Sequence, residues 1–213
     1  MAEVKVTAAM VKELRAATGA GPLDCKKALV ETGGDVQKAI DFLREKGIAK
    51  AQKKLGKGRS MTEGVVEIYQ HFNKRIGVIV EVNCETDFVA NTDQFQTFAK
   101  DIALHISSMK PRYVTREDVP AEELEHEKGV QMRSDDMEGK PDNIKEKIVE
   151  GRLNKWYSDI VLLEQEFLKD DSKTIQKLLE ETVAEVGESI QISRFSLFAL
   201  GEGGDDVANE DDE

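Results

Sequence analysis

Cysteine, histidine, proline and aromatic residues are all scarce in this 213-residue sequence. There are two Cys, three His and four Pro, and aromatic residues make up 6% of the chain. Two cysteines are too few for a disulfide framework, and the N-terminus does not resemble a secretory signal, so we expect reduced thiols and a cytoplasmic protein. No run of about 18 apolar residues is present, and we therefore expect no membrane-spanning helix and no membrane partner.

The side chains that usually carry catalysis are few and scattered. The histidines and cysteines lie on different predicted elements and share no metal-ligand spacing: His71, His105, His126, Cys25 and Cys84. Gly56-Lys57-Gly58 lacks both the spacing and the preceding strand of a phosphate-binding loop. A Cys84 nucleophile with His71 as its base is conceivable across a hairpin, but a small apolar residue ending a buried strand explains Cys84 better. We expect no enzyme, no metal and no cofactor.

Charge is plentiful but unevenly distributed. Charged residues make up 34% of the chain and the net charge is −12. Residues 1–60 hold 13 Lys/Arg against seven Asp/Glu, a net +6, whereas the remaining 153 residues hold 17 against 35, a net −18. Seven of those acids lie in residues 201–213, which we expect to be a disordered acidic tail. The pattern indicates two modules and a tail, and the overall acidity disfavours direct binding of nucleic acid.

Residues 1–48 are predicted to form a small three-helix domain. Thr7 and Asp35 are suitable helix N-caps, and Gly21-Pro22 separates the first two helices. Gly47 is predicted to end the third helix. The basic, Gly-punctuated stretch 49–62 then reads as a linker.

Residues 63–200 are predicted to form an α+β core. The β-branched runs Val65–Tyr69 and Ile76–Val82 suggest an antiparallel hairpin, and the continuous apolar second run suggests a strand covered on both faces. An amphipathic helix carries apolar residues from Phe95 to Ile106. The strand-like segment Ser189–Leu200 is expected to rejoin the sheet.

Two further helical regions belong to this core. The polar segments Glu122–Met137 and Asn143–Trp156 are predicted to form a protruding helical hairpin over about residues 116–156. A last helix is predicted to start at a Ser172 cap and to stop at Gly187.

Thr86-Asp87-Phe88-Val89 places a carboxylate beside a large ring at the junction of a strand and a loop. In one interpretation Phe88 folds back into the core and Asp87 caps the chain locally, which the residue types alone favour. In the other, Phe88 projects as a wedge that enters a partner's crevice, as aromatic anchors do at interfaces.

Several separated segments resemble the elongation factor Ts family. The resemblance covers about residues 3–203. It is carried by Leu14-Arg15 and Thr18-Gly19-Ala20-Gly21, by Asp24-Cys25-Lys26-Lys27-Ala28-Leu29, by Tyr69-Gln70-His71, Ile76-Gly77-Val78 and Asn83–Val89, and by Val149-Glu150-Gly151-Arg152, Lys155 and Ser172-Lys173-Thr174.

This resemblance implies a guanine-nucleotide exchange factor for elongation factor Tu. It implies that a ubiquitin-associated-like N-terminal domain docks on the GTPase domain of the partner, and that Thr86, Asp87, Phe88 and Val89 dislodge the partner's Mg²⁺ so that GDP leaves. It also implies partner contacts at Leu14, Gly21, Pro22, Leu23, Lys26 and His71. The single core implies the short form of the family, whose chains would pair as homodimers in a 2:2 complex.

Two features depart from the family pattern or leave room for another function. Pro22-Leu23 stands where many members carry two methionines, and the proline stiffens the turn. The size of the N-terminal module alone would also fit a helical adaptor that binds some other protein.

Overall fold

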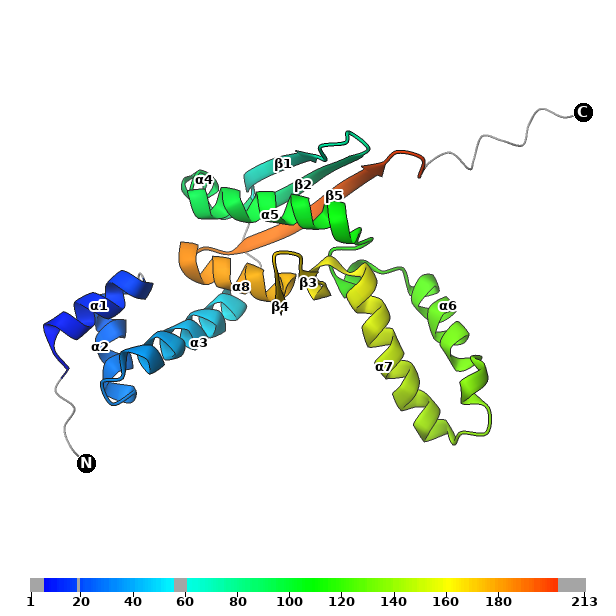
Figure 1. The fold of residues 1–213 in the computed structure, drawn as a ribbon, viewed down its shortest axis with the longest axis horizontal. Helices are drawn as coiled ribbons and strands as arrows, with labels where there is room; N and C mark the ends of the chain where they lie inside the picture. Colours follow the sequence, from blue (N-terminus) through cyan, green and yellow to red (C-terminus); the bar gives the residue numbers. More distant parts are fainter. Residues whose placement is uncertain (1–5, 19, 56–60, 203–213) are drawn as a thin grey trace, which may run out of the picture.

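The N-terminal part of the chain folds into a three-helix bundle (Figure 1). The structure is a computed structural model that describes residues 6–18, 20–55 and 61–202. The bundle consists of α1 (Ala8–Thr18), α2 (Pro22–Glu31) and α3 (Val36–Leu55). The predicted caps are confirmed: Thr7 Oγ1 accepts a hydrogen bond from Met10 N–H at 3.3 Å, and Asp35 Oδ1 accepts one from Lys38 N–H at 3.1 Å. Its small core contains Leu14, Cys25, Ala28, Leu29 and Ala39.

Helix α3 does not end at Gly47, as predicted, but continues to Leu55. A glycine inside a helix costs only about 1 kcal/mol relative to alanine, and here it allows two helices to approach closely. A Cβ at position 47 would lie 3.3 Å from Ala184 Cβ on the core helix α8 (Ile175–Val186). The first part of the predicted linker is therefore helical, and residues 56–60 lie outside the described part of the chain.

The core contains a three-stranded antiparallel sheet of order β1-β2-β5. The predicted hairpin is confirmed as β1 (Glu63–Gln70) and β2 (Ile76–Cys84), and the predicted last strand as β5 (Ile190–Ala199). The prediction that the second strand is covered on both faces is wrong: Val78, Val80 and Val82 are buried, but Ile79 is 43% exposed. Within the chain, helices cover one face of the sheet, so burial along β2 alternates.

The helices on the inner face are α4 (Asp87–Ala90), α5 (Asp93–Met109) and α8. Their apolar residues share one hydrophobic core with the inner residues of the sheet. The predicted Ser172 cap of α8 is wrong, because Thr174 Oγ1 accepts the hydrogen bond from Lys177 N–H at 3.3 Å. Ser172 instead lies in β4 (Asp170–Thr174), which pairs with β3 (Glu166–Phe167) in a small hairpin that was not predicted.

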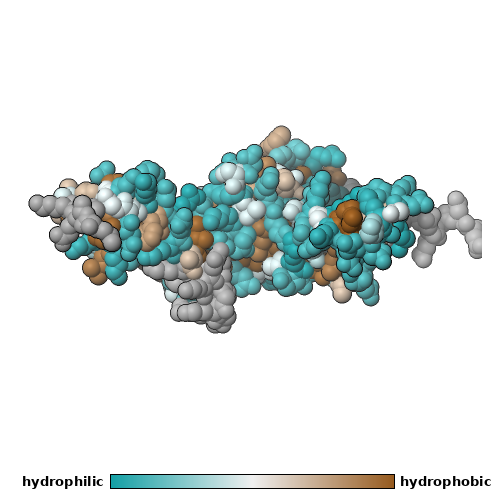
Figure 2. All heavy atoms as spheres, turned by 90° about the horizontal axis from the view of Figure 1, so that it is seen from below, coloured by the Kyte–Doolittle hydropathy of each residue, from teal (hydrophilic) through white to brown (hydrophobic). Residues whose placement is uncertain are grey.

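The predicted helical hairpin projects from the core as an arm (Figure 1). It consists of α6 (Ala121–Met132) and α7 (Asp142–Ile160), with the 3-10 turn η2 (Asp135–Met137) between them. Two further 3-10 turns, η1 (Arg116–Asp118) and η3 (Leu162–Glu164), lie near its base. No helix in the described residues has the length and apolar character needed to cross a membrane. The face shown in Figure 2 is largely hydrophilic, with its apolar side chains in small separate groups.

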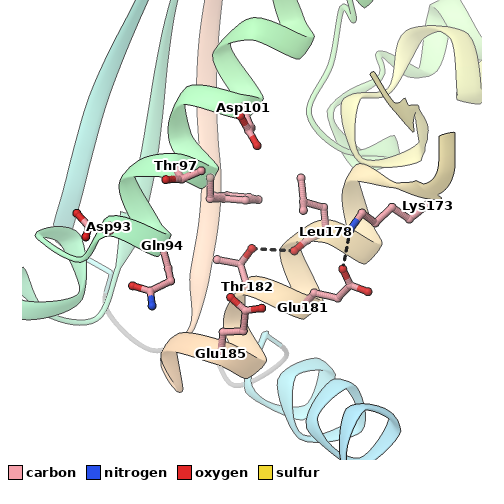
Figure 3. Close-up of a pocket in the computed structure, with 10 residues that line it drawn as sticks. Asp93, Gln94, Thr97, Asp101, Lys173, Leu178, Glu181, Thr182 and Glu185 are labelled. Atoms are coloured by element: carbon pink, nitrogen blue, oxygen red, sulfur yellow. Dashed lines mark hydrogen bonds and ion pairs between the residues drawn. The ribbon is translucent and has the colours of Figure 1, made fainter. Parts of the chain in front are cut away.

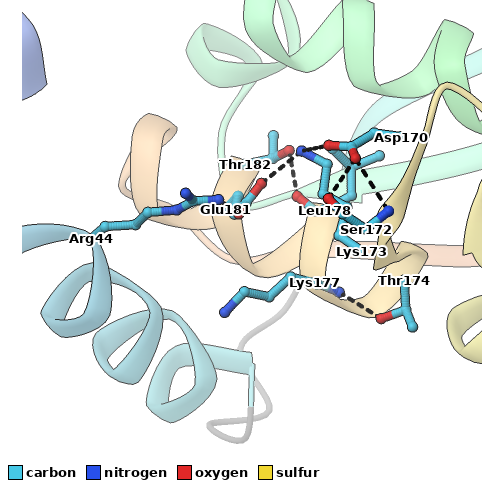
Figure 4. A network of polar contacts seen from close by, with 9 residues as sticks. All are labelled: Arg44, Asp170, Ser172, Lys173, Thr174, Lys177, Leu178, Glu181 and Thr182. Atoms are coloured by element: carbon cyan, nitrogen blue, oxygen red, sulfur yellow. Dashed lines mark hydrogen bonds and ion pairs between the residues drawn. The ribbon is translucent and has the colours of Figure 1, made fainter. Parts of the chain in front are cut away.

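A chain of charges joins the bundle to the core (Figure 4). Arg44 on α3 forms an ion pair with Glu181 on α8. Glu181 also binds Lys173 at 3.0 Å, and Lys173 in turn lies 3.4 Å from Asp170. Burial alone would raise the pKa of Glu181, but the hydrogen bonds from Arg44 and Lys173 outweigh it and lower that pKa below its ordinary value. Glu181 therefore stays ionised and connects the two modules.

Candidate partner-binding site

The segment Thr86–Val89, which we call the wedge, comprises the N-cap and the first three residues of the short helix α4, at one end of the sheet (Figure 1). Thr86 caps this helix and Asp87 lies in its first turn, where a carboxylate suits the positive end of the helix dipole. Phe88 is 77% exposed, whereas Val89 is buried and anchors the turn in the core. The interpretation in which Phe88 folds back into the core is wrong. An exposed ring beside an exposed carboxylate can enter a crevice of a partner.

His71 lies at the other end of β2, at the tip of the β1–β2 hairpin. Its backbone N–H donates to Ile76 O at 2.9 Å, and its Nδ1 lies 3.0 Å from the hydroxyl of Tyr69. The ring of Phe72, which is 88% exposed, contacts the His71 ring with centroids 4.4 Å apart. The half-buried His71 ring therefore contacts both the half-buried Tyr69 and the exposed Phe72. Phe72 was not among the predicted site residues; the signal available in the sequence was an aromatic residue within the polar connection between the two predicted strands.

The exposed face of α2 presents most of the predicted docking residues. Gly21 is the N-cap of this helix and Pro22 is in its first turn. Leu23 is 73% exposed and Lys26 is also exposed. Val30, one to two turns further along the same helix, is 54% exposed and extends this surface.

Leu14 does not belong to that exposed surface. Its side chain is fully buried in the core of the bundle, so the expectation that Leu14 touches a partner is wrong for this structure. A leucine with no exposed area acts on the surface through packing, because it fixes how α1 and α2 lie against each other.

The structure separates the predicted site residues into two groups. Helix α4 and the N-terminal bundle lie towards the same end of the molecule, whereas the hairpin tip with His71 lies at the opposite end of the sheet (Figure 1). The nine residues of β2 separate the two ends by roughly 30 Å.

This separation also contradicts a Cys84 nucleophile with His71 as base. Cys84 pairs with Glu63 at the far end of β2 from His71. Burial raises the pKa of the Cys84 thiol, which favours its unreactive form. Cys84 is a buried residue at a strand end, as the sequence favoured.

A groove lies between α5 and α8 (Figure 3). Its rim carries four acids and one lysine: Asp93, Asp101, Glu181, Glu185 and Lys173. Lys173 is turned towards Glu181, as the dashed line in Figure 3 marks. Among the described residues, no three His, Cys, Asp or Glu side chains gather in a way that could hold a metal ion.

The wedge, the hairpin tip with Phe72 and the exposed face of α2 are surfaces of the kind that protein-binding factors use. Comparison with known proteins makes this specific. The family model described as elongation factor TS matches residues 7–202. Elongation factor Ts of Geotalea uraniireducens is 58% identical over 200 residues, covering 94% of this chain and 92% of the relative. That of Desulfitobacterium hafniense is 59% identical over 199 residues, covering 93% and 91%.

The chain therefore belongs to the elongation factor Ts family, and it is a translation elongation factor. These two relatives match along nearly their whole length, so the similarity covers both modules and the arm.

Proposed function

We propose that this protein is a guanine-nucleotide exchange factor that binds elongation factor Tu–GDP and displaces the partner's Mg²⁺ so that GDP leaves. The observation that carries the proposal is the wedge: a 77%-exposed Phe88 beside Asp87, on a helix anchored by buried Val89. Family membership names the partner, and the wedge supplies a group able to enter it.

This function requires no acid, base or cofactor in the exchange factor. A Mg²⁺ ion neutralises the phosphates of a bound nucleotide, so its loss weakens nucleotide binding. The carboxylate of Asp87 brings a negative charge that competes for such an ion, and the Phe88 ring separates the elements on either side of it. Because coupling between two ligands is reciprocal, GDP must weaken binding of the factor by the same ratio.

The release of labelled GDP from elongation factor Tu tests the proposal with two variants. Asp87→Ala and Phe88→Ala should each slow the accelerated release. Truncating an aromatic anchor costs about 2 kcal/mol or more, roughly a 30-fold loss for Phe88→Ala. Asp171→Ala and Met132→Ala, two exposed positions away from the wedge, are matched controls and should behave like the wild type. No acceleration by the wild-type protein would contradict the function.

The face of α2 is proposed to dock on the GTPase domain of the partner. Leu23→Ala should raise the concentration of factor needed for half-maximal exchange about tenfold, while the maximal rate at saturation stays unchanged. Val130→Ala, an aliphatic truncation on the arm at 42% exposure, is the control. If elongation factor Tu is not bound and Leu23 still mediates binding of another protein, the adaptor function replaces this one.

We also propose that two copies pair through the outer face of the sheet and form a 2:2 complex. Apolar side chains gather on this face from all three strands: Val66 at 62% exposure, Ile68 at 68%, Ile79 at 43% and Phe198 at 69%. Two such faces can stack as a sandwich in which each contributes the same residues, as two-fold symmetry requires.

Solution mass tests the pairing. The wild-type protein should have twice the 23.8 kDa mass of one chain, and Ile68→Glu should reduce it to that of one chain. Ile144→Glu, which places the same charge on the arm at a position 45% exposed, should remain a dimer. A wild-type monomer would refute the pairing without touching the exchange function.

A further inference from the structure

The wedge helix is too short to hold its own position. It has four residues, and a single turn of helix is unstable in water without tertiary support. Its cap is the Thr86 hydroxyl, which accepts a hydrogen bond from Val89 N–H at 3.3 Å. The orientation of Phe88 therefore depends on whatever fixes Thr86.

Glu188 fixes Thr86 from a point 102 residues further along the chain. Thr86 N–H donates to Glu188 Oε2 at 3.1 Å, and the Thr86 hydroxyl lies 2.9 Å from Oε1 and 3.0 Å from Oε2. A hydroxyl has one proton and two lone pairs. Donating that proton to the carboxylate leaves a lone pair for Val89 N–H, so Glu188 orients the cap of the wedge helix.

A second hydrogen bond joins the same two segments with the donor and acceptor roles reversed. Ser189 N–H donates to Glu85 Oε1 at 3.0 Å. The segment that carries Glu188 is itself well placed: Gly187, with a φ of +79°, ends α8 in the left-handed region, and Ile190 is fully buried where β5 begins. The wedge is thereby tied to both α8 and β5.

We propose that Glu188 is a positioning residue for nucleotide exchange, which acts by holding Thr86 so that Asp87 and Phe88 meet the partner in a fixed orientation. This inference rests on the proposed function. A wedge that is ordered before binding does not lose that conformational freedom on entering the partner. Loss of a hydrogen bond to a charged group shifts the equilibrium between the positioned and the unpositioned wedge about tenfold.

Exchange kinetics in a double-mutant cycle test this role. Glu188→Gln removes one of the two carboxylate acceptors and should lower the maximal exchange rate about tenfold. In the Phe88→Ala background the same change should have a clearly smaller effect, because only the carboxylate of Asp87 is then left to be positioned. Thr86→Val should reproduce the loss, Thr86→Ser should retain activity, and Glu185→Gln, on the exposed side of α8, is the matched control.

Amide exchange gives a readout that does not need the partner. Glu188→Gln should speed exchange of the Val89 amide and leave the buried turns of α5 unchanged. The inference is overturned if Glu188→Gln lowers the melting temperature alone, if it slows nucleotide exchange equally in both backgrounds, or if the Val89 amide is unaffected. Lack of exchange activity in the wild type would instead refute the proposed function.

Discussion

At the scale of single residues, the clearest contrast is between Phe88 and Val89. Neighbours in sequence, they are 77% and 3% exposed, because the short helix α4 turns one side chain outward and the next inward. The sequence indicated that this segment was unusual, but not which way Phe88 pointed. The orientation of Phe88 depends on Glu188, which holds Thr86. This dependence leaves no local sequence signal, because Glu188 lies 102 residues further along the chain than Thr86.

Another residue-scale feature is the buried, uncharged His105. Its Nδ1 accepts a hydrogen bond from Leu168 N–H at 3.2 Å, and its Nε2 lies 3.0 Å from Gln165 Oε1. Burial lowers the pKa of His105 below its ordinary 6.5 and outweighs the hydrogen bond to Gln165. Protonation would place a second proton on the ring, at Nδ1, and the hydrogen bond that Nδ1 accepts from Leu168 N–H would be lost.

We therefore predict that stability falls in mild acid partly through His105. Below pH 6.5 the unfolded chain binds more protons at this residue than the folded protein, so the free energy of unfolding decreases as the pH drops through the folded-state pKa. Urea titrations at pH 7.5 and 5.5 should show this decrease, and His105→Gln should have a smaller one. An equal decrease in both proteins would exclude His105 as its source.

At the scale of elements, the turn of the arm is held by one arginine. Arg152 on α7 donates to Ser134 Oγ at 2.7 Å and to Asp136 Oδ2 at 2.7 Å. Hydrogen bonds from Ser134, Arg152 and Lys140 hold the pKa of Asp136 well below its ordinary value. The turn between the two helices is therefore ordered although it lies far from the core.

Arg152→Ala should loosen that turn. The amides of residues 133–140 should exchange faster, since the guanidinium no longer connects Ser134 and Asp136, while the amides of the sheet keep their protection. Lys155→Ala, on an exposed position one turn further along α7, is the control. Unchanged exchange in residues 133–140 would show that the turn does not depend on Arg152.

The sequence predicted elements well where the pattern was local. The β-branched runs gave β1 and β2, and the amphipathic period gave α5. Helix α8 begins after a Thr174 cap and not after the predicted Ser172 cap. Serine and threonine can both cap a helix, and only the pairing of β4 with β3 distinguishes the two positions. The exposed outer face of β2 was missed because a run of apolar residues does not reveal what covers each side.

At the scale of the whole molecule, the bundle and the core are joined along α3 and α8. The residue type of Gly47 predicts a helix stop, whereas in the structure Gly47 lies where α3 contacts α8, and its missing side chain lets Ala184 approach. The predicted boundary after residue 48 therefore falls within a continuous helix. The placement of the docking face of α2 relative to the wedge depends on this contact between α3 and α8.

Gly47→Leu should push α3 away from α8. The factor would then need a higher concentration for half-maximal exchange, and small-angle scattering should show a more extended molecule. Gly47→Ala should have a much weaker effect, because a single methyl group meets Ala184 at 3.3 Å and the gain of about 1 kcal/mol in helix propensity offsets the crowding. Unaltered scattering and exchange for Gly47→Leu would mean that the contact between α3 and α8 does not place the docking face.

The most direct test of the account is the rate of GDP release from elongation factor Tu at saturating factor, with the wild-type protein and Phe88→Ala side by side. The wedge predicts strong acceleration by the wild type and a maximal rate roughly 30-fold lower for Phe88→Ala, with the variant still folded and still bound. Equal maximal rates for the two proteins would contradict the account.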